Sequence, residues 1–196
     1  MQPKATGKLV MDINEAAKGN FQDDREQPLI FVGGPIQHAI IGAGMVERAE
    51  SPIRKIHFMV QSFDLPFVSA HVAEAFGETT NSFTPDEVTH RDYNWMRQCN
   101  LFVAVLPSDE HGRLIRTDGT HIELGWAAAL GKPIIILAHS DAHSQLSHLV
   151  KGLSTVANCA IVPLERVVQR SEILRQAIVD RLGAGVFAKR EELVEN

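Results

Sequence analysis

The stretch TDGTHIELGWAAALGKPIIIL, residues 117–137, predicts a helix over 120–130 that leads directly into a buried strand. Gly131 follows the last apolar turn, where glycine commonly ends a helix. The run KPIIILAHS, 132–140, is apolar enough for a strand covered on both faces. The helix carries one acid, Glu123, in its first turn. A carboxylate is favoured there by the helix dipole, but a buried carboxylate beside a cleft is also a candidate nucleophile or base, and the spacing leaves both roles open.

The same alternation of apolar strands and helices runs through the rest of the chain. Strands are expected in PLIFVGGP (28–35), DLPFVSAHV (64–72), NLFVAVLP (100–107) and NCAIVPL (158–164), and helices over about 51–62, 84–98, 144–153 and 171–182. Thr84, Pro85 and Glu87 form a capping box with proline at the first helical position. The pattern predicts an α/β fold: a single-domain, Rossmann-like or flavodoxin-like, five-stranded parallel sheet with helices on both faces.

The ends of these strands carry most of the polar residues that stand out. Gly33, Gly34 and Pro35 follow the first strand, His71 follows the second with Glu74 close behind, and a polar loop follows Pro107. Open parallel sheets bind ligands at the carboxyl ends of their strands. We therefore expect a small-molecule site at this edge of the sheet.

Composition bounds the organisation and the class of partner. The chain has 196 residues, a formal net charge of −5 and two cysteines. We expect a flexible N-terminal arm over 1–27, one domain over 28–186 and a polar C-terminal tail over 187–196. The acidic balance argues against a nucleic-acid polymer as partner. With no signal peptide and no apolar run of about 20 residues, a cytoplasmic protein without membrane contact is expected.

The usual cofactor and metal motifs are missing. No GxGxxG, GxxxxGK[ST], GxSxG or HExxH occurs, and the nine histidines are scattered. We expect no metal and no cofactor. Asp92 lies mid-helix in HRDYNWMRQC, where a solvated pairing with Arg91 or His90 is the simplest interpretation. Thr117, Gly119 and Thr120 precede a helix and offer hydroxyl and N–H groups to a phosphate.

Four blocks in order resemble the nucleoside 2-deoxyribosyltransferase superfamily. They are LIFVGGPIQ, FVSAHVAEAFG, RDYNWMRQCNLFVAV and DGTHIELGWAAALGKPIIIL, within about residues 29–153. The likeness is to the branch of nucleoside 5′-monophosphate N-glycosidases that includes CMP and hydroxymethyl-CMP hydrolases. It implies a pyrimidine, CMP-like substrate.

The resemblance implies a role for each matching residue. Glu123 would be the nucleophile that attacks C1′ of the sugar, and Asp92 would position the sugar and Glu123 and help to protonate the leaving base. Substrate contacts are implied for Phe31, Gly34, Gln37, His71, Thr117, Gly119 and Ser147, with hydroxyls of Thr117 and Ser147 on the phosphate. The Ser147 equivalent comes from the neighbouring subunit, which implies a homodimer with shared active sites.

The chain departs from the family pattern at a few positions. Phe31 stands where many relatives have tyrosine, Gln37 where they often have arginine, and Asn100 where they commonly have aspartate. His38 or Arg116 would then have to supply the missing cation.

The predicted function is hydrolysis of the base–sugar bond of a nucleoside 5′-monophosphate. The alternatives are a base-exchanging deoxyribosyltransferase and a non-catalytic nucleotide-binding protein on the same fold. A cytokinin-type phosphoribohydrolase ranks lower, because its double glycine is absent before Gly119 and Thr120.

Overall fold

The computed structural model describes residues 27–41 and 44–190. Five parallel strands form one sheet in the order β4-β1-β5-β6-β7. They are β1 Ile30–Gly33, β4 Phe67–Val68, β5 Leu101–Leu106, β6 Ile134–Ala138 and β7 Cys159–Pro163. A hairpin of β2 Ile40–Ile41 and β3 Gly44–Met45 lies outside this sheet. The predicted α/β class and five-stranded parallel sheet are confirmed.

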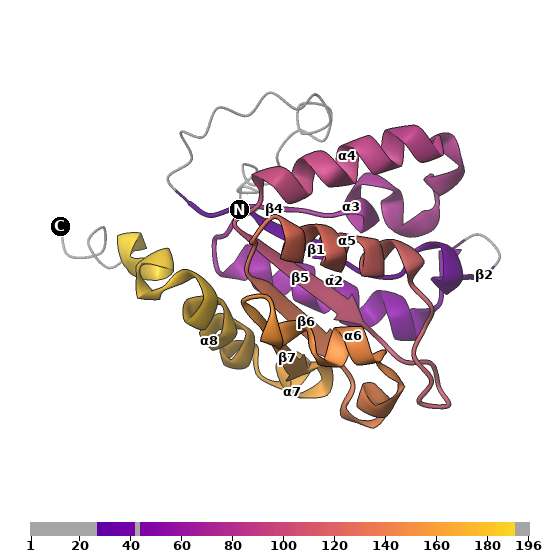
Figure 1. Ribbon diagram of the computed structural model, residues 1–196. Coiled ribbons are helices and arrows are strands. Elements are labelled where there is room, and N and C mark those ends of the chain that lie inside the picture. Colours follow the sequence, from indigo (N-terminus) through magenta and orange to yellow (C-terminus); the bar gives the residue numbers. More distant parts are fainter. Residues whose placement is uncertain (1–26, 42–43, 191–196) are drawn as a thin grey trace, which may run out of the picture.

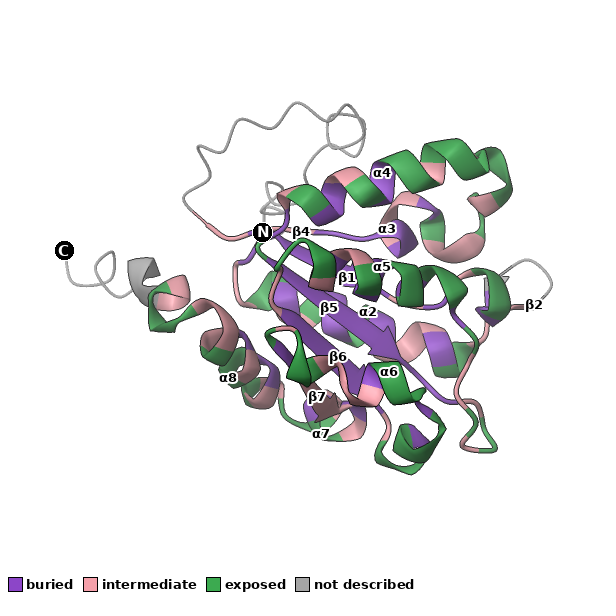
Figure 2. Cartoon of the chain, in the orientation of Figure 1, coloured by how far each residue is buried: buried purple, intermediate pink, exposed green. Residues whose placement is uncertain are grey.

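Helices cover both faces of the sheet (Figure 1). One face packs against α4 Pro85–Gln98 and α5 Asp118–Ala129, with the short α6 His148–Lys151 beside them. The other face packs against α2 Glu47–Ser62, α7 Leu164–Gln169 and α8 Ser171–Leu182. Residues of β1 alternate between the two layers: Phe31 belongs to the first, Ile30 and Val32 to the second. The central strands are buried throughout (Figure 2), as continuous apolar runs require.

The strand order places a crevice beside β1. The chain leaves β1 for β4 on one side and returns to β5 on the other, so β1 lies at the point where the order reverses. In open α/β sheets, ligands bind at the carboxyl ends of the strands at this point. Gly33 ends β1 here, and its neighbour in the sheet is Ala104 of β5.

Local differences from the sequence prediction have simple causes. The second strand is only two residues long, so His71 lies on the short helix α3 Ala70–Ala73 and not at the strand end. The helix predicted from 51 begins at Glu47 and tolerates Pro52 in its first turn and a half. The helix α7, hidden in the polar sequence after the last strand, was not predicted.

The predicted termini are only partly within the described residues. All of the proposed arm except Gln27, and the last six residues of the proposed tail, lie outside them. Phe187 is described and packs edge-on against Phe63 of α2, with the Arg175 guanidinium 4.1 Å from its ring centre. The packed part of the chain therefore reaches Phe187.

Candidate active site

A cavity of about 300 Å³ opens at the carboxyl end of β1. Its wall is built from the loop after β1, the segment after α3, the first turns of α4 and the N-terminal half of α5. The size is at the lower end of the range for small-molecule sites. Four acids line it: Glu74, Asp92 and Glu123 are buried and come from three different segments, and Asp118 is exposed at the start of α5.

Glu123, the candidate nucleophile, is buried in the second turn of α5. The helix α5 begins at Asp118, so Glu123 lies in the second turn and not in the first, as the sequence suggested. Asp118 is the acid of the first turn. Glu123 is 7% exposed, and its Oε2 has no hydrogen-bond partner among the described residues. Helix capping therefore does not account for Glu123.

Glycine at the end of β1 makes room for this carboxylate. A Cβ built on Gly33 would lie 2.5 Å from Oε2 of Glu123 and 2.9 Å from the Phe102 ring. Burial, followed by the nearby charge of Asp92, raises the pKa of Glu123 well above its ordinary value. Arg91 opposes this rise and Glu74 adds to it. A buried carboxylate with a perturbed pKa beside a cavity is typical of a catalytic acid, base or nucleophile.

Asp92 is buried, not solvated as the simplest interpretation of its sequence context had it. It is 7% exposed, and its Oδ1 accepts a hydrogen bond from Arg91 Nε at 2.8 Å. Burial raises its pKa, while the hydrogen bond and charge of Arg91 oppose the rise. Some polar residues of α4 therefore face inward, and the pattern of charges in the sequence could not distinguish them from solvent-exposed ones.

Glu74 and Arg91 join the site, although the sequence analysis noted Glu74 only for its place near a strand end and Arg91 only as a possible partner of Asp92. Arg91 Nη2 donates to Glu74 Oε1 at 2.7 Å, and Thr80 Oγ1 donates to Glu74 Oε2 at 2.7 Å. Both members of the ion pair are less than 10% exposed. The signal in the sequence was weak: a lone Glu after a short helix and an Arg beside an Asp.

The other end of the cavity is formed by the start of α5. Thr117 caps the helix, and its hydroxyl also contacts that of Thr120 at 2.6 Å. Gly119 lines the cavity here. Gly34 and the exposed Gln37, in the segment that follows β1, line it as well. The helix N-terminus directs its N–H groups and a partial positive charge into this region, which suits an anion.

An arginine and a histidine side chain stand at this end. Arg116 donates two hydrogen bonds to Asp118, at 3.0 and 2.6 Å, and His38 Nε2 lies 3.8 Å from the same carboxylate. Both line the cavity. That one of them replaces the missing arginine stays a prediction.

Three predicted contact residues do not line the cavity of this subunit. Phe31 is fully buried and packs edge-on against Trp95 at a ring separation of 5.8 Å. His71 is also fully buried. Ser147 caps α6, where its hydroxyl accepts from Val150 N at 3.2 Å.

His71 holds the loop after β1 in place. Its Nε2 lies 3.1 Å from the carbonyl oxygen of Pro35, which can only accept, so Nε2 carries the proton. Nδ1 then accepts from the Ser69 hydroxyl at 3.2 Å. Burial lowers the pKa of His71 to about 4, which keeps the ring neutral in this arrangement. In the structure its ring therefore holds the loop after β1, and a contact with substrate stays a prediction.

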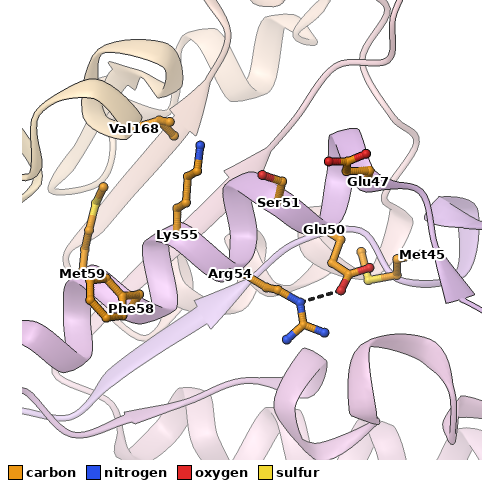
Figure 3. Close-up of a pocket in the computed structure, with 9 residues that line it drawn as sticks. All are labelled: Met45, Glu47, Glu50, Ser51, Arg54, Lys55, Phe58, Met59 and Val168. Atoms are coloured by element: carbon orange, nitrogen blue, oxygen red, sulfur yellow. Dashed lines mark hydrogen bonds and ion pairs between the residues drawn. The ribbon is translucent and has the colours of Figure 1, made fainter.

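A second hollow lies along α2, away from the three buried acids (Figure 3). It is larger, about 670 Å³, and is lined by charged and apolar side chains of α2 together with Met45 and Val168. Its ion pair, Arg54 with Glu50 on successive turns, is largely exposed. Because none of its acids is buried and unpaired, it offers no group poised for chemistry, and the smaller cavity is the better candidate site.

Within residues 27–41 and 44–190, no group of three His, Cys, Asp or Glu side chains is arranged to hold a metal ion. No helix in this part of the chain is long and apolar enough to cross a membrane.

Fold and site together define an α/β protein with a small cavity, lined by buried carboxylates, at the carboxyl end of its parallel sheet. The sequence profile of the nucleoside 2-deoxyribosyltransferase family matches residues 30–182. The chain belongs to this family, and it is an enzyme that acts on nucleosides or nucleotides as an N-glycosidase or a deoxyribosyltransferase. The predicted family is confirmed.

Solved structures agree with this assignment. The CMP N-glycosidase BcmB from Clostridium botulinum aligns with a TM-score of 0.52 at 23% identity, covering 74% of this chain and 98% of that one. BlsM aligns with a TM-score of 0.59 at 26% identity, covering 80% and 94%. No curated protein sequence matches the chain.

Proposed function

We propose that this protein hydrolyses the base–sugar bond of a nucleoside 5′-monophosphate, with Glu123 as nucleophile. The observation that carries the proposal is the buried, unpartnered Oε2 of Glu123 at the floor of the cavity beside Gly33. A carboxylate oxygen without a hydrogen bond keeps its lone pairs free for attack on an electrophilic carbon.

The reaction divides into two displacements. Glu123 attacks C1′, the C1′–N bond breaks, and the base leaves with the bonding electron pair and takes up a proton, for which Asp92 is the proposed donor. The product is a ribosyl ester on Glu123. Water, whose proton passes to the Asp92 carboxylate left by the first step, then attacks C1′ and the C1′–O bond of the ester breaks. Free sugar phosphate and the Glu123 carboxylate are released, and Asp92 is protonated again. Two displacements at one carbon retain its configuration.

The two ends of the cavity suit the two ends of this substrate. The sugar would lie beside the carboxyl groups of Asp92 and Glu123, where negative charge stabilises the positive charge that develops on the ring. The phosphate would lie at the start of α5, near Thr117, with Arg116 as the local cation and the His38 imidazole beside it. A pyrimidine base, as in CMP, follows from the sequence resemblance of the four blocks and is the first to be tested.

A homodimer with shared sites is part of the proposal. Ser147 caps α6 outside the cavity of its own subunit, next to Leu149, which is 85% exposed. A second copy that covers α6 would bring the Ser147 hydroxyl to the phosphate of its neighbour. Mixing Glu123→Ala and Ser147→Ala subunits tests this, since each mixed dimer would contain one complete site. No gain in affinity for the monophosphate over Ser147→Ala alone would contradict a shared site.

The function is tested by chromatography of free base after incubation with ribo- and deoxyribonucleosides and their 5′-monophosphates, with and without a second base. We expect base release from a pyrimidine monophosphate that an added base does not change. Glu123→Ala should lower kcat by roughly three orders of magnitude or more, and Glu172→Ala, an exposed acid on α8, should leave it unchanged. A new nucleoside formed only with the second base would identify a transferase. If the folded wild-type protein released no base from any of these compounds, the result would favour a non-catalytic nucleotide-binding protein.

A further inference from the structure

One buried guanidinium connects two of the three buried acids around the cavity. Arg91 donates through Nε to Asp92 at 2.8 Å and through Nη2 to Glu74 at 2.7 Å. All three side chains are less than 10% exposed, so the contacts are shielded from water. A guanidinium holds its donors in one plane, and it fixes the relative orientation of two carboxylates better than an ammonium does.

The backbone around Glu74 is strained in a way that serves this arrangement. Ala75 and Phe76 follow it with φ of 47° and 53°, and Gly77 with φ of 97°. The left-handed region is unfavourable for residues with a Cβ, and such strain persists only where surrounding contacts hold it. The Phe76 ring is held by the Arg54 guanidinium 3.6 Å from its centre, and Glu74 O accepts from Gly77 N at 2.9 Å. The turn brings the Glu74 carboxylate to the cavity wall.

The ion pair of Glu74 and Arg91 also affects the charge around Asp92 and Glu123. Glu74 lies at the end of α3, Arg91 and Asp92 on α4, and Glu123 on α5, and Arg91 is the cation among these four. The other charged or titratable side chains that line the cavity are His38, Arg116 and Asp118, at the opposite end near the start of α5. Apart from the effect of Asp92 on Glu123, the charges that act on these two carboxyl groups are therefore those of Arg91 and Glu74.

We propose that Arg91 and Glu74 are positioning residues of this active site: their ion pair orients the Asp92 carboxylate and fixes the net charge around Asp92 and Glu123. This inference rests on the proposed function. Neither residue needs to touch the substrate for it to hold.

Replacing Glu74 and replacing Arg91 should therefore shift the ionisation of Asp92 and Glu123 in opposite directions. Glu74→Gln removes a negative charge and makes it easier to ionise Asp92 and Glu123. Arg91→Met removes the positive charge and makes it harder. A group needed only for packing would not produce shifts of opposite sign.

The experiment is a pH profile of kcat/KM for the full chain and its variants. Since one charge at this range changes an ionisation by about one pH unit, we expect the acid limb to move down by up to that amount in Glu74→Gln and up in Arg91→Met. Arg91→Lys should leave the acid limb in place, because the positive charge remains. It should lower kcat by about tenfold, because an ammonium does not reproduce the planar pair of hydrogen bonds to Asp92 and Glu74. Glu78→Gln and Arg97→Met, exposed neighbours on the same segments, are the matched controls.

A readout without turnover separates this inference from the proposed function. The ¹³C carboxyl signal of Asp92, assigned by its loss in Asp92→Asn, should titrate lower in Glu74→Gln and higher in Arg91→Met. If the wild type releases base but the acid limb does not move in Glu74→Gln or in Arg91→Met, this inference is overturned and the proposed function is not. Without base release, the carboxyl titrations decide it, and unmoved or parallel shifts overturn it. If Arg91→Met does not fold, Glu74→Gln and Arg91→Lys carry the same test.

Discussion

Replacing Gly33 by alanine probes the position of the proposed nucleophile without altering its chemistry. The new methyl carbon would lie 2.5 Å from Oε2 of Glu123, and 2.9 and 3.0 Å from two carbons of the Phe102 ring. Phe102 is fully buried in the core and has no free space to move into. The carboxylate of Glu123 is therefore the group that has to shift.

The size of the effect follows from these distances. Ordinary contact between such atoms is about 3.4 Å or more, so Oε2 must retreat by about 0.9 Å. A displacement near 1 Å of a reacting group costs about a hundredfold in rate, which corresponds to about 2.7 kcal/mol in the activation free energy. Overpacking against Phe102 should also lower the free energy of unfolding by about 1–3 kcal/mol.

The measurement is kcat/KM for base release together with urea unfolding of the same samples. Gly125→Ala is the matched control, because Gly125 is exposed on α5, two residues from Glu123, with nothing within 4 Å of an added Cβ. It should keep the wild-type rate and gain about 0.5–1 kcal/mol of stability. A folded Gly33→Ala enzyme with kcat/KM within twofold of wild type would refute the close approach of Glu123 to β1 as a condition of catalysis.

Further predictions concern the acid, the phosphate and the buried imidazole. Asp92→Asn should lower kcat by about 10²- to 10⁴-fold with the fold intact by circular dichroism; an unchanged rate would remove Asp92 from the chemistry. Ser147→Ala should raise KM for a monophosphate by about tenfold, the loss of one hydrogen bond to a charged group, and leave KM for the nucleoside unchanged; equal losses would exclude a phosphate contact. Burial lowers the pKa of His57 from 6.5 to about 3. Below pH 6.5 His57 is protonated in the unfolded chain but neutral in the folded chain. The free energy of unfolding should therefore fall by about 2 kcal/mol from pH 7 to pH 5 because of this residue. His57→Phe, whose ring would keep the stacking on Phe67, should reduce the loss measured by urea unfolding at the two pH values, and an unaltered pH dependence would contradict a neutral His57.

The fold was predictable because its signals are local and repeated. Continuous apolar runs such as 101–106 and 134–138 cannot face water on either side, and a parallel sheet with helices on both faces is the arrangement that buries them. The capping box at Thr84 marked the start of α4 to the residue. Where a strand is held by only two residues, as at Phe67, the sequence around it says little about where the strand stops.

The candidate site was predictable only where a motif carried it. Glu123 and Asp92 were identified through the four ordered blocks, and both line the cavity. Glu74 and Arg91 were not identified, because their significance depends on a contact across 17 residues and on burial, neither of which periodicity reveals. A substrate contact was expected for His71 from its place near the carboxyl end of a predicted strand, and it stays a prediction. The structure places His71 on α3, with its Nε2 3.1 Å from the Pro35 carbonyl oxygen.

The polarity of the cavity connects the proposed chemistry to the fold. A carboxylate nucleophile must be charged to attack, and burial opposes that charge, as the raised pKa of Glu123 shows. An excess of negative charge at the sugar end makes ionisation harder still, but it stabilises the positive charge that develops at C1′ as the base departs. The same excess would repel a phosphate, and the fold separates the two requirements by placing the start of α5 and Arg116 at the other end. Activity should accordingly fall as the pH drops through the raised pKa of Glu123, at a higher pH than for an ordinary glutamate.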